Sequence, residues 1–188
     1  MRQNTLLRFV LLGAASFGAG LALGPILLVL SSFFAAGVLG GVALGVAWRD
    51  MRTAVALGVA SAVGFGIGSF TSLFIIFSSQ TMEGLVSRWV FLGVLAGVVG
   101  GAAIGLALWS LALWDWEVIV TLALVGALGF GIGGGVQDIL RTRLMELRPG
   151  VSVLWPTLYF GVQGAIGGAA LGAALGILKR RQSLEDLY

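Results

Sequence analysis

Few residues in this chain of 188 can do chemistry, because it contains neither His nor Cys. Imidazole and thiolate are the usual protein ligands for zinc, copper, iron–sulfur clusters and haem. His is also the commonest general base and proton relay near neutral pH. We therefore expect no metal, no cofactor and no redox chemistry, and the missing Cys excludes disulfides.

The acidic side chains are the next candidates, and their positions argue against catalysis or ion coupling. A proton-coupled carrier or an intramembrane aspartyl protease needs an ionisable group inside the membrane. All eight acidic residues instead lie in predicted loops, at the ends of apolar segments or in the tail: Asp50, Glu83, Asp115, Glu117, Asp138, Glu146, Glu185 and Asp186. We therefore expect no catalytic residues and no enzyme.

The polar residues most deeply embedded in apolar sequence form one cluster. Gln137, Asp138 and Arg141 lie near the end of the fifth apolar segment, and Gln163 lies about two turns into the sixth. In antiparallel neighbours these residues reach similar depth, and the amide of Gln163 needs partners in lipid, for which Gln137 is the nearest candidate. Asp138 and Arg141 are three residues apart, so a local ion pair explains them better than a ligand site does.

Hydroxyl groups add to this cluster. Ser69 and Ser72, in the third apolar segment, are predicted to lie toward the same side of the membrane. Such hydroxyls often bond only to carbonyls of their own helix. As a ligand site, the six residues would line a polar vestibule: Gln137, Asp138, Arg141, Gln163, Ser69 and Ser72.

The composition determines which elements must position these residues. The chain is 59% hydrophobic and only 10% charged, with a mean hydropathy of +1.06, whereas a soluble domain is about one-quarter charged. A membrane-crossing helix needs about 20 apolar residues, and the apolar runs here are long and do not alternate as barrel strands do. We predict an all-α integral membrane protein, one membrane domain over residues 1–188, with six transmembrane helices and a cytoplasmic tail over 179–188. The helices are expected at residues 5–23, 25–48, 53–77, 89–113, 118–140 and 156–178, the first two separated by Gly24-Pro25.

Two short motifs recur at similar depth and indicate an internal repeat. The motif Phe-Gly-x-Gly begins at Phe17, Phe65 and Phe130 in the odd-numbered helices. The motif Gly-Gly-x-x-x-Gly begins at Gly40, Gly100 and Gly167 in the even-numbered ones. We predict three repeated helical hairpins in a compact Gly-rich bundle with a pseudo-threefold axis. Chance matches in a composition dominated by small and aliphatic residues are the alternative.

The repeat also bears on the first segment. Arg2 followed by an apolar stretch is compatible with a signal peptide, which would be cleaved. A segment that shares its motif with later helices is better explained as a permanent span.

Small residues four apart on one helix face let two backbones approach closely in a membrane. We predict helix packing, as in a glycine zipper, for Gly64, Gly68, Gly97, Gly101, Gly105, Gly129, Gly133, Gly164, Gly168 and Gly172.

The basic residues predict the orientation. On the side that carries both termini there are seven: Arg2, Arg8, Arg49, Arg52, Lys179, Arg180 and Arg181. The other side has four: Arg88, Arg141, Arg143 and Arg148. We expect the protein in the cell (inner) membrane, and the positive-inside rule then places both termini in the cytoplasm. Because these charges flank apolar spans, they do not indicate nucleic-acid binding.

We expect either of two functions. The first is a small-solute transport or channel component without catalytic chemistry, in which the hairpins surround a path. The second is a passive scaffold or assembly subunit, with other membrane subunits or further copies of the chain as partners besides the lipid bilayer. A transporter needs a cavity that reaches the midplane, whereas a scaffold is packed through its centre and exposes a small-residue face.

Overall fold

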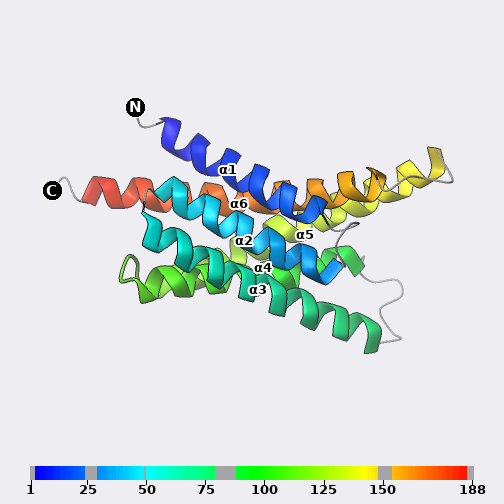
Figure 1. Ribbon diagram of the computed structural model, residues 1–188, viewed down its shortest axis with the longest axis horizontal. Helices are drawn as coiled ribbons and strands as arrows, with labels where there is room; N and C mark the ends of the chain where they lie inside the picture. The colour runs from blue at the N-terminus through cyan, green and yellow to red at the C-terminus, as the bar shows by residue number, and fades with distance from the viewer. Residues whose placement is uncertain (1–2, 24–28, 49, 79–87, 148–153, 186–188) are drawn as a thin grey trace.

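The computed structural model describes residues 3–23, 29–48, 50–78, 88–147 and 154–185 (Figure 1). This part of the chain forms six helices and no strand: α1 (Gln3–Ala22), α2 (Val29–Trp48), α3 (Met51–Ser78), α4 (Arg88–Ser110), α5 (Glu117–Leu147) and α6 (Leu154–Glu185). Each contains a segment long and apolar enough to cross a membrane. The predicted set of six helices is confirmed, whereas the Gly24-Pro25 break lies outside the described residues.

The last two helices are longer than predicted. α5 has 31 residues and α6 has 32, so at about 1.5 Å per residue both exceed the roughly 30 Å of a hydrocarbon core. α5 continues through Arg141 and Arg143, and α6 continues through Lys179. Charged residues end a span but favour a helix, which explains the difference from the predicted ends at 140 and 178.

The helices form a closed ring. Each packs against its neighbours in sequence, α1 and α6 close the ring, and α2, α4 and α6 also contact one another. The start of α1 and the end of α6 lie at the same end of the bundle, beside the start of α3 and the α4–α5 connection (Figure 1). We call this the termini end, and the other the opposite end.

Glycine allows the helices to approach this closely. At each of the ten glycines expected to pack, an added Cβ would come within 2.8 Å of an atom on a neighbouring helix. At Gly97, Gly101, Gly164, Gly168 and Gly172 the nearest such atom is a carbonyl oxygen, which cannot move aside without shifting the helix. The bundle therefore depends on backbone-to-backbone contact at these positions.

Three phenylalanine rings fill the centre of the bundle. The ring centroids of Phe17 and Phe65 are 5.2 Å apart, those of Phe17 and Phe130 5.6 Å, and those of Phe65 and Phe130 4.8 Å. All three side chains have no exposed surface. Toward the termini end the core continues with further fully buried apolar residues: Leu44, Ile104, Leu171, Phe9, Leu57 and Leu122. We call Phe17, Phe65 and Phe130 the phenylalanine triangle.

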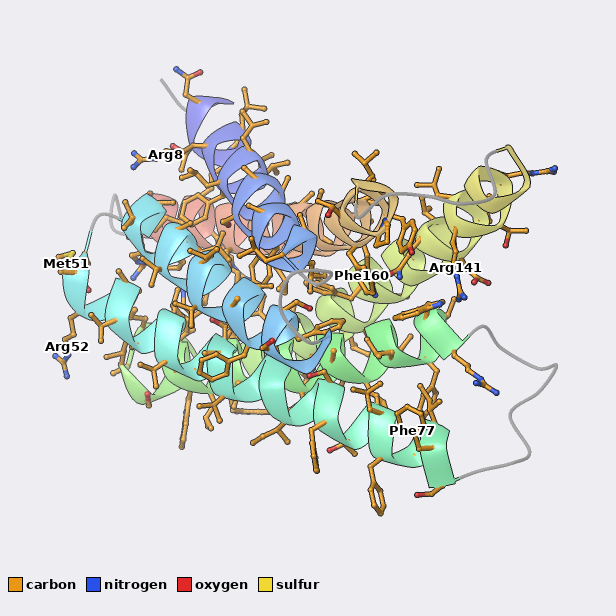
Figure 2. All side chains as sticks on the ribbon, turned by 45° about the vertical axis from the view of Figure 1, so that its right-hand side comes forward. Arg8, Met51, Arg52, Phe77, Arg141 and Phe160 are labelled. Atoms are coloured by element: carbon orange, nitrogen blue, oxygen red, sulfur yellow. The ribbon has the colours of Figure 1, made fainter. Side chains whose placement is uncertain are left out.

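The outward surface of the bundle is also apolar. Phe77, at the far end of α3, is 83% exposed, and Met51 and Arg52 project from the first turn of α3 (Figure 2). Between Met51 and Phe77 the outer face of α3 carries exposed apolar side chains, including Val55, Val59 and Ile67. Such a surface suits contact with acyl chains rather than water.

We expect Gly97→Ala to destabilise the protein by about 1 to 3 kcal/mol, because the new methyl group would overlap the carbonyl oxygen of Gly126. Thermal unfolding in detergent measures the effect. Gly135→Ala is the matched control, since its methyl group would lie 3.6 Å from the Val90 side chain, an ordinary contact. Equal melting temperatures for the two variants would show that the α4–α5 contact is looser than described.

Asp50 caps α3 at the termini end. Its carboxylate accepts hydrogen bonds from the backbone N–H of Thr53 (2.9 Å) and of Arg52 (3.2 Å) and from the Thr53 hydroxyl. These hydrogen bonds hold the pKa of Asp50 below its ordinary value of 3.8, and the bond from the Thr53 hydroxyl has the largest effect.

We expect Asp50→Ala to speed amide hydrogen exchange in the first turn of α3, whereas Asp50→Asn keeps a cap and changes it little. Because the pKa is lowered on folding, the cap contributes above pH 3.8 and is lost as pH falls through the folded-state pKa. Exchange that is insensitive to both substitutions would rule out this cap.

Candidate functional site

Two amide side chains lie wholly inside the bundle near its opposite end. Gln137 on α5 and Gln163 on α6 have no exposed surface. A Cβ added to Gly133 would lie 2.7 Å from the carbonyl oxygen of Gln163, so these two residues are at the same level. Gln137 is therefore about one turn nearer the opposite end than Gln163.

The two amides make no hydrogen bonds. Among the residues that the structure describes, neither the Oε1 nor the Nε2 atom of Gln137 or Gln163 has a partner. The expected pairing of the two amides is therefore not found, because their levels differ by one turn. A buried polar group without a partner costs about 1 to 3 kcal/mol, so these atoms require an explanation.

A glycine on α4 provides the space for one amide. A Cβ added to Gly93 would lie 2.9 Å from Nε2 of Gln163 and would overlap the carbonyl oxygen of Phe130. Gln163 thus extends from α6 past α5 toward α4. We call Gln137, Gln163 and Gly93 the amide site, which lies between α4, α5 and α6.

Aromatic side chains lie next to the amide site at the opposite end. The Trp89 ring packs edge-on against Phe160 at 5.2 Å, and Tyr159 packs against Phe160 at 5.5 Å. The guanidinium carbon of Arg141 lies 6.0 Å from the Trp89 ring centroid, and Figure 2 shows Arg141 and Phe160 at the same end of the bundle.

The other predicted site residues make different contacts. No ion pair joins Asp138 to Arg141 among the described interactions, since Arg141 lies over Trp89 instead. Ser69 and Ser72 are buried on α3, where their hydroxyls donate to the carbonyls of Gly66 (3.0 Å) and Gly68 (2.6 Å). Both hydroxyls therefore donate to carbonyls of their own helix, which is the alternative to a ligand site given in the sequence analysis.

A pocket at the termini end is not predicted by the sequence analysis. It has a volume of about 640 Å³ and lies where the end of α4, the start of α5 and the end of α6 meet. Its polar and aromatic lining includes Trp109, Trp114, Asp115, Glu117, Arg181 and Gln182. In the sequence, the alternation of Trp with Asp and Glu over residues 114–117 is the pattern that could have indicated this pocket.

Comparison with known proteins finds no match to a protein family, to a curated protein or to a solved structure.

We expect Gln163→Met to raise the melting temperature of the ligand-free protein. Methionine has a similar volume and removes two unpartnered polar atoms, which should stabilise the protein by about 1 to 3 kcal/mol. Ile166→Met, about one turn further along α6, introduces the same side chain without removing an amide and serves as the control. A lower melting temperature for Gln163→Met would mean that its amide is already satisfied.

Proposed function

We propose that the protein spans the cell (inner) membrane with both termini in the cytoplasm. The apolar outer face of the helices supports insertion in a bilayer. Arg8, Arg52, Lys179, Arg180 and Arg181 lie in helix segments at the termini end, which supports the orientation.

We further propose that α1–α2, α3–α4 and α5–α6 are three copies of one hairpin. In each, the Phe of the first helix packs on the first Gly of the Gly-Gly motif in the second. The three pairs are Phe17 with Gly40, Phe65 with Gly100, and Phe130 with Gly167. A second set of contacts has the same spacing: Gly20 with Ala36, Gly68 with Ala96, and Gly133 with Gln163. Chance similarity in composition does not predict equivalent contacts.

The third and the second hairpin each depart from the repeat at the amide site. Gln163 occupies the position that Ala36 and Ala96 hold in the first two hairpins. Gly93, whose missing side chain makes room for the amide, corresponds to Phe33 and Phe160, both buried phenylalanines. Two departures from the repeat therefore occur at the same place, as expected where a repeat has acquired a function.

On this basis we propose that the protein is a transport or channel component for a small, neutral, polar solute. The observation that carries the proposal is the complete burial of the Gln137 and Gln163 amides, whose four polar atoms have no partner among the residues that the structure describes. Each amide offers a donor and an acceptor, so a solute with both kinds of group satisfies them.

The route for such a solute runs along α4, α5 and α6 rather than along the centre of the ring. The phenylalanine triangle fills the centre, whereas the amide site lies between these three helices. Between the amide site and the termini end lie buried apolar side chains that include Leu108, Leu122 and Leu175, so the route is closed in this conformation.

The packed centre favours the alternative function, a passive scaffold or assembly subunit. A scaffold of this kind also needs a small-residue face directed outward. The glycines predicted to pack are instead turned toward neighbouring helices of the same chain, and the outer surface carries larger side chains. The scaffold therefore remains the second candidate.

Flux into proteoliposomes tests the proposed function, with acetamide, urea and uracil as solutes. We expect at least one solute to enter faster than into protein-free liposomes. Replacing Gln137 or Gln163 by Met should slow entry about tenfold, since one lost hydrogen bond of about 1.4 kcal/mol has that effect. Ile166→Met should retain the flux.

Absence of flux and of binding for all three solutes would contradict a transport role for the amide site. Equal flux in the Gln variants and in Ile166→Met would contradict the assignment of the amides.

A further inference from the structure

The pocket at the termini end combines two kinds of charge with aromatic rings. The carboxylates of Asp115 and Glu117 and the guanidinium of Arg181 are the ionic groups in its lining, and Trp109 and Trp114 contribute indoles. Its volume of about 640 Å³ lies within the range of small-molecule sites, about 300 to 1,000 Å³. A ligand that matches this lining carries both a cation and an anion.

The position of the pocket suggests where such a ligand comes from. Trp109 is 51% exposed near the end of α4, and Leu106, one turn earlier, is equally exposed on the apolar outer surface. A tryptophan at the end of an apolar helix marks the boundary between acyl chains and headgroups. The pocket is therefore continuous with the surface that faces lipid in the proposed orientation.

The charges select among lipid headgroups. Guanidinium binds a phosphate through charge-assisted hydrogen bonds, and two carboxylates accept hydrogen bonds from a primary ammonium, which has three N–H donors. A quaternary ammonium has no N–H donor, so it forms none of these hydrogen bonds and keeps only its charge attraction to the carboxylates and its contact with the indole faces. A headgroup with a phosphate alone would face two carboxylates without compensation.

Two further features distinguish this pocket: an unusual backbone conformation and a buried indole N–H. Ala112, in the lining, has a φ of 54°, a left-handed conformation that is uncommon for a residue with a Cβ. The indole N–H of Trp114 is buried without a hydrogen-bond partner among the described residues. A phosphate or ester oxygen is the kind of acceptor that this N–H requires.

We propose that this pocket binds the headgroup of a phosphatidylethanolamine-type lipid from the leaflet at the termini end. Arg181 binds the phosphate, Asp115 and Glu117 bind the ammonium, and the acyl chains lie along the exposed face of α4. The proposal is independent of the solute at the amide site, which lies at the other end of the bundle.

Native mass spectrometry of the detergent-solubilised protein tests the proposal. The protein is equilibrated with equal amounts of phosphatidylethanolamine, phosphatidylcholine and phosphatidylglycerol that have identical acyl chains. We expect one phosphatidylethanolamine per protein, retained about tenfold over each of the other two lipids. Arg181→Gln and the double variant Asp115→Asn/Glu117→Gln should each lose this preference.

Two variants at the same end serve as matched controls. Arg52→Gln removes one positive charge and Asp50→Asn one negative charge from equally exposed positions outside the pocket, and both should keep the preference. An unchanged melting temperature establishes that a variant that loses the lipid is still folded. If a variant does not fold, the competition of phosphatidylcholine and phosphatidylglycerol with phosphatidylethanolamine on the wild-type protein still tests the headgroup preference.

Equal retention of phosphatidylcholine would overturn the ammonium assignment, and preferred retention of phosphatidylglycerol would overturn the role of the carboxylates. Soluble phosphoethanolamine, added as a competitor at the concentration of the lipid, tests the source of the headgroup. Displacement of the lipid at equal concentration would mean that the pocket binds the free solute and would overturn the lipid assignment.

Discussion

Close backbone approach through glycine is the constraint on which the rest of the structure depends. The phenylalanine triangle closes only because Gly40, Gly100 and Gly167 present no side chain to the three rings. Aromatic rings in contact at about 5 Å then fill the space in which a central pore would lie. A polar path through this bundle must consequently lie away from the centre.

The amide site follows from the same geometry. With Gly93 on α4 and Gly133 on α5, the helices approach Gln163 closely enough to bury its side chain completely, yet no described residue pairs with the amide. Burial of an unpaired polar group lowers stability, so its occurrence where the proposed third copy of the hairpin departs from the other two favours a functional role. An apolar residue at position 163 would avoid this loss of folding stability. The presence of Gln there is therefore better explained by the proposed function than by the fold.

Much of the fold could be predicted from the sequence, because the length of an apolar segment determines whether a helix can cross a membrane. Gln137 and Gln163 could also be identified, since amides stand out in apolar helices. Their failure to pair could not be predicted, because it depends on a register difference of one turn between α5 and α6. The pocket depends on how three distant segments meet, and its charges look like ordinary helix-end charges in the sequence.

The most direct test of a closed centre with an off-centre polar site uses the absence of Cys from the chain. Single Cys residues at positions 65 and 163 are exposed to a small membrane-impermeant thiol reagent, added separately to each side of reconstituted vesicles. We predict that Gln163→Cys reacts slowly from the opposite end only, and that Phe65→Cys stays unmodified from both sides although Cys leaves more room than Phe. Modification of Phe65→Cys from both sides, with Gln163→Cys inert, would contradict the account by revealing a path through the centre.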